Sequence, residues 1–304
     1  MARIVGGFAS SYSPQLNLQP DAWNEMARRD FEVLEVTQEL DPCARRDAPA
    51  FDARTSHLRC QEYLANLGSR FVKVSTDVLI ILAEDEQGLV ESCSKTSVLV
   101  FAGGEVPYHF GEMPPQTAWA YGEQPRTFVG SPVPAERLAA ELAAVGISTS
   151  RAESLPEGAS IGHHVGFLHN RILRGRPPAI LPVLLNSKRL PSPCDAFKIG
   201  ATLRQAVGRL PEDLRVGAAA LGGLSHIRID EILDRRVLRA CASGAIDDLA
   251  VLPNDGGTAS HSHNRPWIAL TAMMSGFQMN LLGYEAAYRS SMGTGCGMAF
   301  AVWE

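Results

Sequence analysis

An α/β fold is the class that the sequence predicts, because short apolar runs alternate with amphipathic segments along the chain. The clearest buried strands are residues 78–83 and 216–221, which are short, uncharged and apolar. Amphipathic segments at 53–74 and 193–209 repeat their apolar residues at helical spacing. We therefore expect an open sheet whose strands are joined by helices.

The remaining elements follow the same alternation. Further strands are expected at 3–8, 97–102 and 178–185, further helices at 20–40, 133–145, 232–238 and 266–282, and a loop at 247–254. Residues 103–130 contain many Gly, Pro and aromatic residues, which favours a long ordered excursion that covers a pocket rather than a linker.

Length and composition limit the function classes. The 304 residues can bury a large core, as one domain or as two closely packed ones. Hydrophobic residues make up 45% and charged residues 20%, and the net charge of −5 gives no basic surface for a nucleic acid. No apolar run reaches the ~18 residues that cross a bilayer, and the N-terminus reads as a strand rather than a signal peptide. Six scattered cysteines without paired spacing favour a reduced, cytoplasmic protein and argue against a metal–cysteine cluster.

A glycine-containing turn follows the strand at 216–221 and carries a histidine. Gly222 and Gly223 allow a tight turn or a close approach, and Ser225 and His226 come soon after them. In an open α/β sheet, ligands bind where strands end and helices begin. An imidazole exchanges a proton near neutral pH, so His226 is a candidate acid or base. The alternative is a histidine that caps a turn.

Polar side chains also follow two other predicted strands. Tyr12 lies in the loop after the first strand, where it is either a packing residue or part of a site. An acidic loop at 84–88, which includes Glu86 and Gln87, follows the most apolar strand. Such a loop is ordinary solvated surface in most proteins, but its place at the end of a strand also fits a binding site.

Two pairs of histidines lie close together in the sequence. His163 and His164 are adjacent, so their side chains point in different directions and at most one of them is expected to face a shared site. His261 and His263 are separated by one residue, and such a pair can bind a metal ion when a third ligand is near. Without that third ligand, the pair alone is only a weak indication of a metal site.

Several stretches, in their order and spacing, resemble the class III extradiol ring-cleavage dioxygenases, the family of protocatechuate 4,5-dioxygenase and the gallate dioxygenases. The strongest matches are SIGH at 160–163, PVLLN at 182–186, GGLSH at 222–226, DEILDRR at 230–236, YRS at 288–290 and GTG at 293–295, with weaker support from SYSP at 11–14 and RPWI at 265–268. The resemblance covers most of the chain and implies a single α/β domain over residues 1–304, with a mixed central sheet flanked by helices. It also implies a homodimer or a hetero-oligomer with a paralogue.

The resemblance assigns roles to two histidines that this chain retains. Members of the family hold Fe(II) with two histidines and one glutamate, which leaves open positions for a catechol and O2. A further histidine acts as acid or base and corresponds to His226, and a second pocket histidine corresponds to His163.

The three iron-ligand positions differ from the family pattern. Tyr12 stands at the first histidine position, Glu86 or Gln87 at the second, and His263 at the glutamate position. A phenol, with an ordinary pKa near ~10, is a poor ligand for a divalent ion. We therefore expect no metal cofactor. Non-haem iron held by Tyr12, Glu86 and His263 is the alternative, because a phenolate suits ferric iron.

Three hypotheses for function follow. The favoured one is a metal-independent enzyme of aromatic-compound catabolism that hydrolyses, cleaves, decarboxylates or tautomerises a phenolic or ring-derived acid. Its site would consist of the catalytic residues His226, His163, Tyr12, Glu86 and His263 and the substrate-binding residues Ser225, Gln87 and His261. The alternatives are a ring-cleaving dioxygenase with an altered metal site and a non-catalytic subunit that pairs with an active paralogue.

Overall fold

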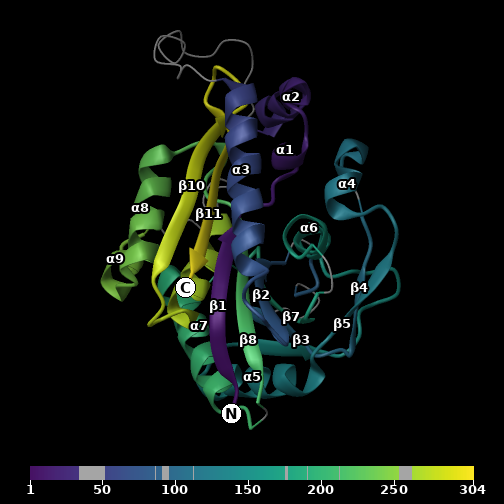
Figure 1. The fold of residues 1–304 in the computed structure, drawn as a ribbon, viewed down its shortest axis with the longest axis vertical. Coiled ribbons are helices and arrows are strands. Elements are labelled where there is room, and N and C mark those ends of the chain that lie inside the picture. Colours follow the sequence, from purple (N-terminus) through teal and green to yellow (C-terminus); the bar gives the residue numbers. More distant parts are fainter. Residues whose placement is uncertain are drawn as a thin grey trace.

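A mixed β-sheet forms the centre of the protein and carries helices on both of its faces (Figure 1). This computed structural model describes residues 1–33, 52–85, 87–90, 96–111, 113–174, 177–189, 191–211, 213–252 and 262–304. Within these residues the sheet has nine strands in the order β10-β11-β1-β8-β2-β7-β3-β6, with β9 paired to β11. The predicted α/β class is confirmed, and so is the mixed central sheet flanked by helices.

The elements have the following bounds. The strands are β1 (Arg3–Ser10), β2 (Val78–Glu84), β3 (Val98–Phe101), β4 (Glu105–Tyr108), β5 (Arg126–Val129), β6 (Thr149–Ala152), β7 (Ala179–Leu185), β8 (Arg215–Leu221), β9 (His226–Arg228), β10 (Met279–Tyr288) and β11 (Thr294–Trp303). The α-helices are α1 (Pro14–Asn17), α2 (Trp23–Val33), α3 (Ala53–Phe71), α4 (Ala118–Tyr121), α5 (Pro132–Ala144), α6 (His164–Phe167), α7 (Pro193–Gly208), α8 (Glu231–Ser243), α9 (Ile246–Ala250) and α10 (Arg265–Met273). Short 3-10 helices are η1 (Pro20–Ala22), η2 (Pro115–Thr117) and η4 (Ser262–Asn264), and η3 (Leu168–Ile172) is a π-helix. None of the helices formed by the described residues is long and apolar enough to span a membrane.

Four neighbouring strands, β1, β8, β2 and β7, run parallel to one another. β11 is antiparallel to both β1 and β10, and β3 is antiparallel to β7. The carboxyl ends of the parallel strands therefore meet at one edge of the sheet, which is where open α/β sheets bind ligands. Ser10, Glu84 and Leu221 are the last residues of three of these strands.

An apolar core lies on each face of the sheet. α3 crosses one face, together with α6 and η3, and α5, α7, α8 and α10 cover the other (Figure 1). Side chains of β8 alternate between the two cores, because Ala218 and Ala220 belong to one and Ala219 to the other. Small residues also allow helices to approach closely. A Cβ on Gly200 of α7 would lie 1.8 Å from the carbonyl oxygen of Ala269 in α10.

Most predicted elements are present, and two predictions are wrong. The helix predicted at 266–282 is α10, which ends at Met273, and the following residues enter the edge strand β10. Gly276, with a φ of +91°, adopts a left-handed conformation that breaks the helix there. The predicted loop at 247–254 begins with the short helix α9. The helix predicted at 20–40 is observed as α2, and its later residues lie outside the described part of the chain.

The segment 103–130 contains β4 and β5, which pair as a separate two-stranded sheet, together with η2 and α4. In Figure 1 this segment lies on the side of the molecule that carries α6, away from α8 and α9. The expectation of an ordered excursion agrees with this arrangement of its described residues.

Candidate active site

A cavity of about 160 Å³ lies at the carboxyl ends of β1 and β8. Its described lining residues are Ser11, Tyr12, Ser13, Pro14, His163, Gly223, Ser225, His226, His263, Cys296 and Gly297. Side chains that can exchange protons thus reach one small space from separate parts of the chain, which is typical of an active site. A larger hollow of about 610 Å³ at the amino end of β1 is lined by arginines and apolar residues and offers no comparable acid or base.

The turn between β1 and α1 places Tyr12 in the cavity wall. Ser13 caps α1, because its hydroxyl accepts a hydrogen bond from the Gln15 N–H at 3.3 Å. Tyr12 is buried, and its ring centroid lies 5.6 Å from that of His163 and 6.2 Å from that of His164. The structure therefore places Tyr12 and His163, two of the predicted site residues, side by side in the wall of one cavity.

The two adjacent histidines differ as expected. His163 lines the cavity, whereas His164 is 1% exposed and does not. Burial and, to a lesser extent, the charge on His163 together lower the pKa of His164 to about 3. Neither ring nitrogen of His164 has a hydrogen-bond partner among the described residues, so this imidazole is held neutral. It is a packing residue behind Tyr12.

A hydrogen-bond network around Asp234 holds Ser225, the residue before His226. The N–H and the hydroxyl of Ser225 donate to Asp234 at 2.8 and 2.7 Å, and the Tyr284 hydroxyl donates to it at 2.9 Å. Burial raises the pKa of Asp234 to about 6, against the lowering effect of these hydrogen bonds. Ile227 has a φ of 67°, a left-handed conformation that is costly for a β-branched residue. The network thus anchors Ser225 on one side of His226, and pairing of His226 with Cys296 of β11 holds the strained segment against the sheet.

A buried carboxylate supports the third histidine of the cavity. Glu84, the last residue of β2, places its Oε2 3.4 Å from Nδ1 of His263, and its side chain is 3% exposed. The ring of His263 meets that of His226 at an interplanar angle of 84°, with centroids 5.5 Å apart. A carboxylate beside one imidazole nitrogen orients the ring and favours its protonated form. Glu84 and His263 therefore form a pair suited to proton transfer.

Close packing against β8 holds His263 in place. A Cβ on Gly222 would lie 2.4 Å from the His263 carbonyl oxygen, so η4 contacts the end of β8 without any intervening side chain. The Trp267 indole N–H donates to the Gly222 carbonyl at 3.0 Å and fixes the start of α10 to the same strand end. Of the two glycines singled out in the sequence, Gly222 is therefore the one that a close backbone approach requires.

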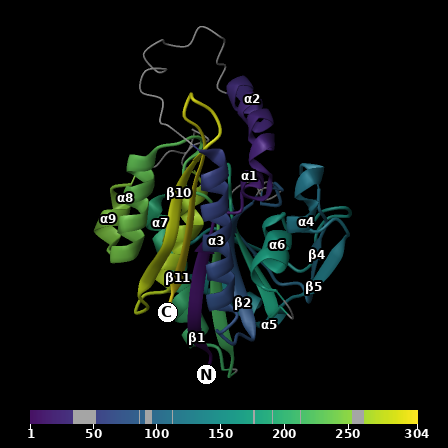
Figure 2. The same cartoon turned by 45° about the horizontal axis from the view of Figure 1, so that its top comes forward.

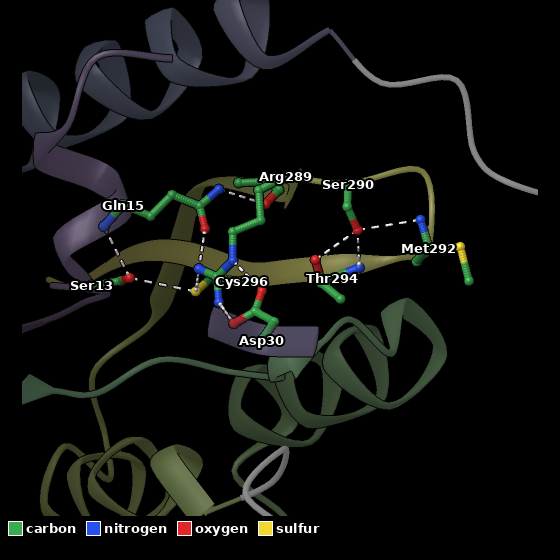
Figure 3. A network of polar contacts seen from close by, with 9 residues as sticks. Ser13, Gln15, Asp30, Arg289, Ser290, Met292, Thr294 and Cys296 are labelled. Atoms are coloured by element: carbon green, nitrogen blue, oxygen red, sulfur yellow. Dashed lines mark hydrogen bonds and ion pairs between the residues drawn. The ribbon is translucent and has the colours of Figure 1, made fainter. Parts of the chain in front are cut away.

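A buried ion pair lies behind the cavity wall, as Figure 3 shows. Arg289 donates to both carboxylate oxygens of Asp30 at 2.5 Å, to Gln15 Oε1 at 2.8 Å and to Cys296 Sγ at 3.6 Å. Cys296 Sγ also lies 3.4 Å from the Ser13 hydroxyl. Burial raises the pKa of the Cys296 thiol, although the nearby guanidinium opposes the shift. The network links two lining residues to α2 and to the turn between β10 and β11.

The excursion at 103–130 contacts the site from behind. The Tyr121 hydroxyl donates to the Tyr12 carbonyl and accepts a hydrogen bond from Asn17 Nδ2 at 3.2 Å. Its ring lies 5.6 Å from that of His163 at 80°. Among the described residues that line the cavity, none comes from 103–130. The predicted cover is therefore a support for Tyr12 and His163 rather than a wall of the cavity.

Four predicted site residues need separate comment. Glu86 and His261 lie outside the described residues. Gln87 is exposed in a turn beyond β2 and does not line the cavity. Ser225 lines the cavity, but its hydroxyl donates to Asp234, so it positions His226 instead of offering that proton to a substrate.

Sequence reasoning missed Glu84 as a site residue. The alignment with the family placed the second ligand position two or three residues later. A glutamate that ends an otherwise apolar strand was the available signal, because a buried carboxylate needs a partner. The alternation of side chains along β2 does not by itself reveal that partner, since His263 is distant in sequence.

The described side chains in the cavity are not arranged like the iron ligands of that family. A facial triad needs two imidazoles and one carboxylate directed at the same point. Here Glu84 faces His263, and the ring of His226 stands edge-on to that of His263. Tyr12 supplies a phenol, a poor ligand for a divalent ion. Among the described residues, no group of three or more His, Cys, Asp or Glu side chains is placed to hold a metal ion.

Comparison with known proteins supports the fold alone. No family model matches the chain, and no curated protein matches it. Solved structures do match, among them the uncharacterized protein JW3007 from Escherichia coli K12, with a TM-score of 0.51 and 12% sequence identity. That match covers 98% of this chain and 99% of the other, so the whole α/β architecture is shared.

Proposed function

We propose that the protein is an enzyme of aromatic-compound metabolism with a fold of the class III extradiol dioxygenase type, and that it moves protons on a small phenolic or ring-derived acid without a metal ion. The observation that carries the proposal is the Glu84–His263 pair, which lies beside His226 in one cavity. Proton transfer by positioned side chains is the chemistry that such groups supply.

His263 is the general base in this proposal. Its Nδ1 faces Glu84, so Nε2 is the nitrogen that exchanges a proton with the substrate. The carboxylate stabilises the imidazolium that forms when Nε2 takes the proton. Return of a proton to another atom of the same molecule completes a tautomerisation, a reaction that needs no second reactant.

The other residues that line the cavity can return the proton to the substrate and bind one of its oxygen atoms. The ring of His226 lies 5.5 Å from that of His263, close enough for both to act on one small substrate. His163 and Tyr12 meet on the other side of the cavity and can donate hydrogen bonds to a substrate oxygen. A cavity of roughly 150 Å³ holds one benzene ring, so the size of this one favours a monocyclic substrate.

Proton exchange into candidate substrates tests the proposal directly. Single-ring phenolic acids and their ring-derived keto acids are incubated with the protein in D2O, and NMR follows the loss of carbon-bound protons. We expect exchange in at least one acid, and we expect His263→Gln and Glu84→Gln to slow it by roughly 100-fold or more. His169→Gln is the matched control, because His169 contacts Arg126 and Asn170 away from the cavity.

Three outcomes contradict the proposal. Exchange that survives His263→Gln would exclude His263 as the base. If the purified protein held one iron per chain and His263→Gln lost that iron, the protein would instead be a dioxygenase with an altered metal site. A protein that binds and exchanges none of the acids would fit a non-catalytic subunit instead.

A further inference from the structure

β10 is an edge strand of ten residues that pairs only on its β11 side among the described residues. Gln278 and Glu304 exchange two backbone hydrogen bonds before the strand begins, and the Arg289 N–H donates to Thr294 after it ends. In an antiparallel pair of strands, residues that exchange hydrogen bonds with the partner strand alternate with residues whose backbone groups point away from it. The hydrogen-bonded positions at Gln278 and Arg289 therefore show which residues of β10 point outward before and after the bulge at residue 282. The backbone groups that point away from β11 belong to Met279, Leu281, Tyr284, Ala286 and Tyr288.

The two edges of the sheet are protected unequally. At the other edge, β6 has four residues and carries Arg151, which forms ion pairs with Glu136 at 2.6 Å and Glu153 at 2.8 Å. Short length and charge are the usual means by which proteins prevent strands from adding to an edge. β10 has neither, because Glu285 is its single charged residue and it contains no proline. Its edge is therefore open to another strand.

Large apolar side chains are exposed beside this edge. Leu281, whose backbone faces outward, is 43% exposed. Ile232 is 82% exposed and follows Glu231, which accepts a hydrogen bond from the Tyr288 hydroxyl at 3.0 Å. Leu281 is thus an exposed aliphatic residue on the edge strand itself, and Ile232 is another on α8, the helix that contacts β10 through Glu231, as expected of a surface that is covered in an assembly.

A two-fold rotation between two copies of the chain would place each charged side chain next to the edge opposite one of the other sign. Glu231 of α8 contacts Tyr288, and the Arg235 guanidinium lies 5.0 Å from the Tyr284 ring centroid. A two-fold axis through Ala286 places Tyr284 of one copy opposite Tyr288 of the other. Glu231 and Arg235 form an ion pair within each copy at 3.3 Å. The axis brings Glu231 of each copy towards Arg235 of the other, so the two ion pairs lie side by side with their charges alternating.

We propose that two copies of this chain form a two-fold dimer through antiparallel pairing of β10 about Ala286, so that one sheet continues across both copies. Pairing about Ala286 satisfies the outward backbone groups of Tyr284, Ala286 and Tyr288, places Leu281 opposite residue 291 of the other copy and sets the α8 charges against each other. The dimer contact lies on the far side of β11 from β1, so it does not involve Tyr12 or the end of β8. Its test does not depend on the proposed reaction.

Proline at the centre of the edge tests the dimer. The Ala286 N–H faces outward, so Ala286→Pro removes a donor from the contact without breaking a bond to β11. Sedimentation should give the wild-type protein twice the chain mass of 32.8 kDa and Ala286→Pro the mass of one chain. Leu281→Lys should also give single chains, and Val129→Lys, which changes a 69% exposed residue of β5, should stay dimeric. Circular dichroism confirms that each variant is folded.

A wild-type protein that sediments as one chain at a concentration on the order of 100 micromolar would overturn the proposal, as would a dimer that survives both edge variants.

Mixing experiments test the two-fold axis itself. Glu231→Arg and Arg235→Glu each bring like charges together in a dimer of one variant, whereas a mixed dimer of the two pairs opposite charges. We expect each variant alone to dimerise several-fold more weakly than the mixture. Equal affinities would exclude pairing about Ala286.

Discussion

At the scale of single residues, Asp234 links the loop that carries His226 to the pH of the solution. It is 1% exposed, and burial raises its pKa to about 6. Three donors from Ser225 and Tyr284 surround it and stabilise the carboxylate only in part. In the unfolded chain, an aspartate releases its proton near pH ~4.

Asp234→Asn is therefore expected to change how stability depends on pH. Between about pH 4 and 6 the unfolded chain releases this proton while the folded chain retains it, so the wild-type protein loses up to about 3 kcal/mol of stability as the pH rises. Below pH ~4 both states are protonated, and the effect vanishes. The variant lacks this loss, so its free energy of unfolding should improve relative to wild type as the pH rises.

Urea unfolding at several pH values between 4 and 7 measures the difference. Asp247→Asn is the control, because Asp247 is exposed in α9. Parallel curves for wild type and Asp234→Asn would mean that Asp234 is ionised in the folded protein throughout this range.

At the scale of elements, the end of β8 and the 3-10 helix η4 define the position of His263. Gly222→Ala would place a methyl group 2.4 Å from the His263 carbonyl oxygen, whereas Gly223→Ala meets its nearest neighbour at 3.9 Å. We expect Gly222→Ala to cost about 1–3 kcal/mol of stability and to move His263 away from Glu84. Gly223→Ala should change little. Thermal unfolding and an NMR titration of the His263 ring report both effects, and equal behaviour of the two variants would contradict them.

The excursion at 103–130 acts on the site through one hydroxyl. Tyr121→Phe leaves the Tyr12 carbonyl and the Asn17 amide short of a partner, which costs about 1–3 kcal/mol in a buried setting. Tyr108→Phe removes a hydroxyl that donates to the Tyr121 carbonyl at 2.8 Å, so it is a matched control in the same segment. We expect only Tyr121→Phe to shift the NMR titration of His163, whose ring contacts Tyr121. A similar shift in both variants would argue against a specific link.

The sequence predicts which edge of the sheet carries the site, but it does not predict the contacts between the site residues. Strand runs followed by polar residues pointed to Tyr12 and His226, because parallel strands bring their carboxyl ends to one edge. The pairing of Glu84 with His263 depends on how η4 lies against Gly222, a long-range contact that local patterns do not encode. The resemblance to the family pointed to Glu86 or Gln87 instead, and Glu86 lies outside the described residues.

The strands also differ in how well the sequence predicts them. Apolar runs in β2 and β8 are buried on both faces and were easily predicted. β10 is a half-exposed edge strand, and its apolar residues could equally continue the helical pattern of α10. Only pairing with β11, which follows in the sequence, decides between helix and strand.

At the scale of the whole molecule, a buried ion pair connects α2 to the turn that follows β10. α2 lies at the same end of the molecule as the turn between β10 and β11 (Figure 2). Arg289 and Asp30 are 2% and 5% exposed, so both charges are removed from water. Their mutual attraction offsets the desolvation only because the guanidinium contacts both carboxylate oxygens and also Gln15.

Removing one charge should therefore harm the protein more than removing both. Arg289→Met leaves the Asp30 carboxylate buried without its partner, and we expect a loss of about 3–5 kcal/mol in the free energy of unfolding. Asp30→Leu combined with Arg289→Met replaces the pair by apolar groups and should recover most of that loss. Urea unfolding measures the stability, and hydrogen exchange of the α2 amides shows whether this helix loosens in the single variant and tightens again in the double one. A double variant as unstable as Arg289→Met would mean that the fold requires the hydrogen bonds of Arg289 to Gln15 and Cys296, and not the charge pair, to hold the cavity wall against α2.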